Sequence, residues 1–117
     1  MATDFRSGRD FPRRGREQLG GYYWLARVFD KARAARNATI HDYIYPCPLD
    51  RGVFERWGIT SEQFDKALET STTDDAILAW VKANVPDAQR DDANHWVIVD
   101  KVNSLDKQDS EEGVVAA

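Results

Sequence analysis

The sequence predicts an all-α fold: a single compact domain of about five helices, with an extended N-terminal arm and a rigid proline-rich loop. Apolar residues recur at steps of three and four in several segments, as they do on one face of a helix. With 117 residues, 42% of them apolar, and four tryptophans, the chain can build one hydrophobic core but not two. We expect a flexible arm over residues 1–11, a helical domain over 12–105 and a disordered acidic tail over 106–117.

The first helix is expected over residues 19–36, after an Arg-rich segment that has no apolar period. Its apolar side chains form a wide stripe, which indicates a buried helix. Arg27, Asp30 and Lys31 are expected on the opposite side, where local ion pairs can form. Asn37 is the expected C-cap, in the left-handed conformation.

A rigid loop is expected over residues 42–50, which read Asp-Tyr-Ile-Tyr-Pro-Cys-Pro-Leu-Asp. Pro46 and Pro48 each lack an N–H and push the preceding residue into extended geometry. In an extended segment Tyr43 and Tyr45 point to the same side. The loop would therefore hold both hydroxyls toward solvent or a ligand.

Capping signals mark the next two helices. Asp50 is the expected N-cap of a short helix that ends at Gly58. Thr60 and Gln63 then have the spacing of a capping box, which predicts a new helix.

The apolar spacing predicts a further helix over residues 74–84, with Trp80 in the core together with Trp57 of the preceding short helix. Residues 86–94 are polar and are expected to form a loop. From Trp96 onward apolar residues repeat every three positions, which favours a last helix. For residues 96–102 a strand stays an alternative, because Trp-Val-Ile-Val is aromatic and β-branched.

Charge is unevenly distributed along the chain. Residues 1–36 carry a net charge of +5 and residues 37–117 a net charge of −9. We expect the basic third to fold onto the acidic remainder, or its charges to be solvated. The alternative is that the arm meets a small anion or a nucleic acid. The acidic total of −4 argues against nucleic acid, and Asp74 and Asp75 argue against a recognition helix in the major groove.

The cysteine content and the N-terminus indicate a soluble cytoplasmic protein. Cys47 is the only cysteine, so no intrachain disulfide can form. The first ten residues lack the apolar core of a secretory signal, and no uncharged apolar run is long enough to span a membrane.

Five segments carry a resemblance to a known family: Arg-Gly-Arg-Glu-Gln-Leu-Gly-Gly-Tyr over 14–22, Leu-Ala-Arg-Val-Phe-Asp-Lys-Ala-Arg over 25–33, the loop over 42–50, and the segments 54–59 and 75–81. On these residues the chain resembles a bacterial family known as domain of unknown function 5069, over about residues 12–84. It departs from the family pattern at Pro46, where we expect Asn in many relatives. The resemblance implies a small, mainly helical domain and implies no activity.

His41, Tyr45 and Cys47 are the candidates for catalytic chemistry. A nucleophilic cysteine needs a histidine, a cation or a helix N-terminus nearby, and the short helix after the loop could supply the last of these. The competing interpretation is that Cys47 is a small apolar residue buried between two prolines. The spacing of His41, Cys47 and His95 matches no common metal motif, so we expect neither a metal nor a cofactor.

Paired glycines at a helix start, with arginines before them, can bind an anion. The competing interpretation is that Gly20 and Gly21 let the arm pack closely against the helix. The candidate ligand-binding residues are Arg14, Arg16, Gly20, Gly21, Arg27 and Tyr43.

The sequence therefore favours a non-enzymatic binding or interaction module with an anion site at the Gly-Gly helix start. The alternative is an enzyme that acts on a small phosphorylated or carboxylate substrate through the Tyr-Pro-Cys-Pro loop. The identity of the small anion or protein partner, and whether the chain forms a homo-oligomer, stay open at this point.

Overall fold

The computed structural model describes residues 4–7 and 10–112, and over these ranges its regular elements are helical, without a strand. The elements are α1 (Leu25–Arg36), α2 (Pro48–Trp57), α3 (Ser61–Ala67), α4 (Asp74–Asn84), α5 (Asp87–His95), the π-helix η1 (Trp96–Asp100) and α6 (Val102–Glu111). The all-α prediction is confirmed, with six α-helices in the described ranges where about five were expected. Predictions for residues 1–3, 8–9 and 113–117 lie outside the described residues.

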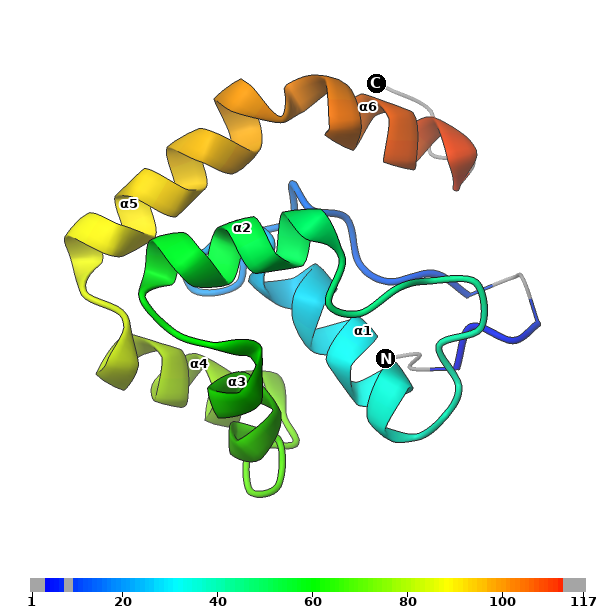
Figure 1. Cartoon of the computed structure of the whole chain (residues 1–117), viewed down its shortest axis with the longest axis horizontal. Coiled ribbons are helices and arrows are strands. Elements are labelled where there is room, and N and C mark those ends of the chain that lie inside the picture. The colour runs from blue at the N-terminus through cyan, green and yellow to red at the C-terminus, as the bar shows by residue number, and fades with distance from the viewer. Residues whose placement is uncertain (1–3, 8–9, 113–117) are drawn as a thin grey trace.

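The helices surround α1 and α2, which lie in the middle of the molecule (Figure 1). Helices α3 and α4 lie together on one side, and α5, η1 and α6 follow one another as an arc along the opposite edge. The arm, taken from here on as the described residues before Leu19, passes between the start of α1 and α6: a Cβ on Gly15 would meet both the Trp24 ring and Leu105. The Cα radius of gyration, 13.4 Å, is that of a compact chain of this length.

Helix α1 begins at Leu25, six residues later than expected. Leu19 and Tyr22 exchange both backbone hydrogen bonds, and the glycines between them have φ angles of 58° and 90°. Trp24, the N-cap, is also left-handed, with a φ of 72°. A right-handed helix cannot pass through such angles, so the Gly-Gly segment forms a turn ahead of α1.

Helix α1 is buried on its polar side as well as on its apolar stripe. Arg27, Asp30 and Lys31 are all buried, because the arm, the start of α2 and the end of α6 cover them. The expectation of local ion pairs on this side is met only at Asp30, which accepts from Arg33 at 2.7 Å; the other partners come from distant segments. At its C-terminus Asn37 has a φ of −93°, and the left-handed residue is Ala38 instead.

The predicted capping box of α3 is present: Gln63 N donates to Thr60 Oγ1 at 3.1 Å, and Thr60 N donates to the Gln63 side chain at 2.9 Å. Gly58 ends α2 in the left-handed conformation, as expected. Asp50 is not the N-cap of α2. Cys47 takes that position and Pro48 is the first helical residue, so the helix starts inside the double-proline loop.

The C-terminal third differs most from the prediction. Residues 87–95, expected as a loop, form α5, and α6 extends to Glu111, inside the segment expected to be a disordered tail. Between them η1 has a wider turn, in which Lys101 N donates to Trp96 O at 3.0 Å. The preference for helix over strand in this region is confirmed. None of the helices within the described ranges has both the length and the apolar character needed to cross a bilayer.

Aromatic rings connect the helices through the core. Phe54 of α2 contacts Trp57 with 6.0 Å between ring centroids and Phe64 of α3 at 5.1 Å. Tyr22 packs edge-on against Trp57, and Trp80 of α4 edge-on against Phe64. Trp57 is fully buried and Trp80 partly buried, so both take part in the core as predicted.

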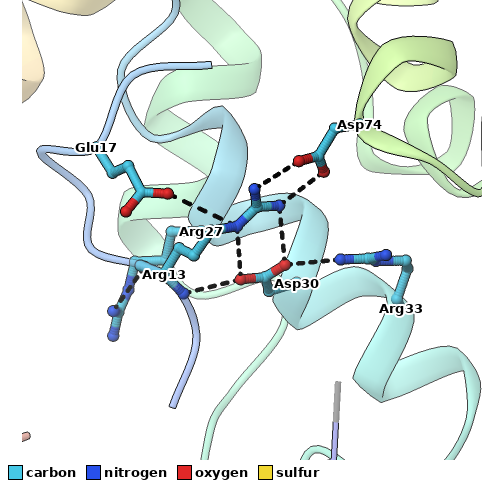
Figure 2. A network of polar contacts seen from close by, with 6 residues as sticks. All are labelled: Arg13, Glu17, Arg27, Asp30, Arg33 and Asp74. Carbon is cyan, nitrogen blue, oxygen red and sulfur yellow. Dashed lines mark hydrogen bonds and ion pairs between the residues drawn. The ribbon is translucent and has the colours of Figure 1, made fainter. Parts of the chain in front are cut away.

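The basic arm is bound by acidic residues of the same chain. Arg13 stands at the centre of this network, with Asp30 of α1 on one side and Asp74 of α4 on the other (Figure 2). Its hydrogen bonds to the two carboxylates measure 2.8–3.1 Å. Arg14 bonds Asp109 of α6 at 2.6 Å. The basic third therefore folds onto the acidic remainder.

Candidate functional site

A large hollow lies where both ends of the described chain meet α1 and the loop that follows α1. Its volume is about 590 Å³, within the range of small-molecule sites. The arm, α1, the loop after α1 and the end of α6 each supply one wall. Its lining residues are Phe5, Asp10, Phe11, Arg27, Lys31, His41, Asp42, Tyr43, Ile44, Cys47, Gln108, Glu111 and Glu112. We refer to it as the arm–loop pocket.

Cys47 enters the pocket at the start of α2, where its side chain caps the helix. Asp50 N donates to Cys47 Sγ at 3.5 Å, and Cys47 N donates to the Asp50 carboxylate at 2.9 Å. Lys31 Nζ lies 3.3 Å from the same sulfur and 2.8 Å from Asp50 Oδ2. Asp50 is fully buried and also accepts from Trp24 Nε1 at 2.8 Å. The thiol is thus fixed beside an ammonium group and a helix N-terminus.

This surrounding has opposing effects on a thiolate. An ammonium group and a helix N-terminus both stabilise the negative sulfur that acts as a nucleophile. The Asp50 carboxylate has the opposite effect, because its negative charge neutralises the Lys31 ammonium group that also contacts the sulfur. Lys31 therefore binds a carboxylate and a sulfur at once, and both contacts are buried or partly buried.

A second cluster of polar side chains in the pocket joins Arg27 to Glu112, the residue that follows α6. Arg27 Nη1 and Nη2 donate to the two carboxylate oxygens of Glu112 at 3.1 and 2.8 Å. The Tyr43 hydroxyl donates to Glu112 Oε2 at 2.8 Å. Burial, followed by this hydrogen bond and the charge of Glu112, raises the pKa of Tyr43 well above its usual range, so the phenol stays protonated and donates. Among the described residues the buried Arg27 Nε and Gln108 Oε1 have no hydrogen-bond partner.

His41 and Asp42 form the exposed rim. His41 Nε2 lies 3.3 Å from Asp42 Oδ2, and both side chains are open to solvent. Phe11 and Ile44 expose apolar surface on the same rim. The pocket therefore has buried cations inside and exposed carboxylates and apolar groups around its mouth.

Four of the predicted site residues meet in this pocket: Arg27, His41, Tyr43 and Cys47. Tyr45 does not join them. Its hydroxyl donates to Asp65 of α3 at 2.6 Å, and it lines a separate hollow of about 300 Å³. Burial, together with that hydrogen bond, raises the pKa of Tyr45 well above its usual range. Tyr43 and Tyr45 thus do not share one site, contrary to the expectation that they point to the same side.

The arginines and glycines expected at the helix start lie elsewhere. Arg14 and Arg16 both bind Asp109 of α6, at 2.6 and 3.4 Å, and Arg16 also pairs with Asp106. Gly20 packs against α4: a Cβ at this position would collide with the Leu78 side chain. Gly20 is therefore at a point of close packing, but the neighbour is α4 and not, as expected, the helix that follows the glycines.

Gly21 is fixed in another way. Its carbonyl accepts from Asn94 Nδ2 of α5 at 2.8 Å, and Asn94 Oδ1 accepts from Tyr23 N at 3.0 Å. The Asn94 side chain thereby binds the backbone carbonyl of Gly21 and the backbone N–H of Tyr23, and so fixes the turn ahead of α1.

Nine of the thirteen lining residues were not among the candidates, and three of these nine contact candidates that are buried or half-buried. Lys31 lies four residues after Arg27 on α1, so the helical period would have placed the two cations on one face. Phe5 belongs to the arm, and no local pattern connects it to residue 43, with which its ring makes an edge contact at 5.3 Å between centroids. Glu112 belongs to a segment expected to be disordered. Within the described ranges no group of three or more histidine, cysteine, aspartate or glutamate side chains could hold a metal ion.

Fold and site together define a small all-α domain whose two ends enclose one pocket. A family model matches residues 9–116, nearly the whole chain, and the protein belongs to that family, described as a domain of unknown function (DUF5069). No match was found among curated proteins.

Proposed function

We propose that the protein is a small-molecule-binding domain and that the arm–loop pocket holds an anionic ligand. The observation that carries this proposal is that two buried cations, Arg27 and Lys31, line the arm–loop pocket. A buried cation strengthens any contact with an anion, because little water screens the charge.

The pocket supports this site better than the Gly-Gly turn does. All four cations pair with carboxylates of the same chain, but the side chains of Arg14 and Arg16 are 40% and 32% exposed, so water screens their charge, whereas Arg27 and Lys31 are buried. The Leu78 side chain occupies the space beside Gly20, so no ligand can approach the glycine from that side. At the pocket, by contrast, the apolar rim at Phe11 and Ile44 leaves surface for the uncharged part of a ligand.

Binding can be tested by thermal unfolding of the whole protein with inorganic phosphate, glucose 6-phosphate, acetate and succinate. A ligand at 100 times its Kd stabilises the fold by about 2.7 kcal/mol, which is easily measured as a shift in Tm. Phe11→Ala at the rim should weaken binding, whereas Val99→Ala on η1 should leave it unchanged. The two side chains are comparably exposed, 40% and 51%. If no compound raises Tm, or if both variants bind as the unaltered protein does, the proposal fails.

A second candidate function is an enzyme acting on a small anionic substrate, favoured by the contact between Lys31 Nζ and Cys47 Sγ. Cys47 would be the nucleophile and His41, on the rim, would transfer protons. Incubation with p-nitrophenyl acetate tests the nucleophile: attack by Sγ forms a thioester and releases p-nitrophenolate. Mass spectrometry should then find one acetyl group on Cys47, with none on the Cys47→Ser variant and a slower reaction in Lys31→Met. An unmodified Cys47 would exclude this function.

A further inference from the structure

The carboxylate held by Arg27 and Tyr43 comes from the end of the chain's own last helix. We propose that Arg27 and Tyr43 form a receptor for a small monocarboxylate, that Glu112 occupies this receptor as an internal ligand, and that an external carboxylate binds by displacing the Glu112 side chain. This inference rests on the proposed function, because it names the ligand class of the same pocket and what controls access to it.

The geometry matches a carboxylate. Two guanidinium nitrogens of Arg27 face the two oxygens of Glu112, which is the planar two-point contact that arginine makes with carboxylates. The Tyr43 hydroxyl adds a third donor to one of the oxygens. These groups are held in place before any ligand arrives: Arg27 also donates to Arg13 O at 3.2 Å, and its guanidinium lies 5.7 Å from the Trp24 ring centroid.

The receptor is attached firmly on one side and weakly on the other. Arg27 lies in the first turn of the buried helix α1, whereas Glu112 is the C-cap residue that follows α6. Rotation of the Glu112 side chain breaks none of the backbone hydrogen bonds of α6, and helix ends open at low cost. Arg27 Nε has no partner among the described residues, so a ligand oxygen there would satisfy a buried donor that Glu112 leaves unbonded.

The charges around the receptor select for a single negative charge. Exchange of Glu112 for a monocarboxylate leaves the charge facing Arg27 unchanged. A dianion such as phosphate adds a second charge close to three exposed carboxylates of the pocket lining, Asp10, Asp42 and Glu111. The receptor should therefore prefer acetate to phosphate, although both are anions.

Replacement of Glu112 by alanine provides the test, because the atoms removed correspond to those of acetate. Acetate should bind Glu112→Ala about tenfold or more tightly than it binds the unaltered protein, since the internal competitor is gone. It should also raise the Tm of this variant, while chloride and phosphate at equal ionic strength should not. Glu111→Ala is the charge-matched control, because it removes the same charge from the pocket lining without emptying the receptor: it should strengthen acetate binding only slightly, and phosphate binding at least as much. Its side chain is 64% exposed, against 7% for Glu112.

Acetate binding to Glu112→Ala that is no stronger than to the unaltered protein, or no stronger than that of chloride, overturns the receptor. If Glu112→Ala does not fold, Glu112→Gln replaces it, because the amide keeps the volume and one acceptor oxygen; the same rise in acetate affinity is required. A phosphate ligand of the unaltered protein, without an acetate effect on either variant, would leave the binding function standing and overturn the receptor. Acetate binding to Glu112→Ala without any ligand for the unaltered protein would overturn both the displacement of Glu112 and the proposed binding function, and would leave Glu112 as a permanent occupant of the Arg27–Tyr43 site.

Discussion

Arg13 binds Asp30 through both its backbone and its side chain: the N–H at 2.8 Å, Nη2 at 3.0 Å and Nε at 3.1 Å from the carboxylate oxygens (Figure 2). The same guanidinium continues to Asp74 of α4. One arm residue thus connects the centre of α1 to the first turn of another helix. The arm is part of the folded domain at this point.

Arg13→Ala should lower the free energy of unfolding by about 3 kcal/mol, because it leaves the buried Asp30 carboxylate with fewer donors. The loss stays at the lower end of the range for a broken buried pair, since Arg33 still donates to Asp30 at 2.7 Å. Urea unfolding measures it. Arg14→Ala is the control, with a side chain 40% exposed against 19% for Arg13, and should cost much less. Equal losses would mean that the Asp30 contact is not what stabilises the arm.

Asp74→Asn should reduce stability at neutral pH and make little difference in acid. Hydrogen bonds from Arg13 lower the pKa of Asp74 below its ordinary value of 3.8. The ionised pair therefore stabilises the fold above pH 3.8, and this stabilisation is lost as the pH falls through the lowered pKa. Unfolding free energies of the two proteins should differ at about pH 6 and converge towards about pH 2.

The control for Asp74→Asn is Asp75→Asn. Asp75 is exposed but lies in the same first turn of α4, so both substitutions lose a similar interaction with the helix dipole. It should show a smaller difference at every pH. A difference for Asp74→Asn that persists undiminished in acid would contradict the role given to the Arg13 pair.

Gly20→Ala should be clearly more destabilising than Gly21→Ala. Both residues have left-handed backbone angles, so an alanine at either position costs about 1–2 kcal/mol in strain. Only at Gly20 would the new methyl group also collide with Leu78, while at Gly21 nothing lies within 4 Å. Thermal unfolding of the two variants separates strain from packing. Similar values of Tm would show that α4 moves aside without cost.

Cys47→Ala should cost about 1 kcal/mol, and Cys47→Ser should be at least as stable as the unaltered protein. The reason is the N-cap position: the sulfur accepts from Asp50 N, and a serine hydroxyl is a better acceptor there. Chemical denaturation measures both changes. If serine destabilises as much as alanine, packing of the sulfur against Lys31, and not capping, accounts for the residue.

Features that depend on neighbours three or four residues away could be predicted from the sequence. The Thr60–Gln63 capping box and the Gly58 C-cap are of this kind, and both are present. Helix α5 could not, because it has no apolar stripe and Ala93 is its only buried residue among those described. Its packing against α2, and not its own composition, accounts for its place in the fold.

The start of α1 and the extent of α6 were missed for different physical reasons. A glycine pair permits left-handed angles without requiring them, and the positive φ of Trp24 follows no local rule. Helix α6 is held by Arg14 and Arg16, which lie more than 90 residues earlier. Such contacts have no signature in the local sequence. For the same reason Arg27 could be named as a candidate but its partner Glu112 could not.

The π-helix between α5 and α6 fixes which side of α6 faces the arm. A turn that spans five residues accommodates one residue more than an α-helical turn, and one residue corresponds to a rotation of about 100°. Deletion of a single residue from Trp96–Asp100 should restore an α-helical turn at this position and rotate α6 by that angle. Leu105, Asp109 and the residue after α6 would then turn away from Gly15, Arg14 and Arg27 together. The number of residues in this segment, more than their identity, sets the alignment of the last helix with residues 14–16 and with Arg27.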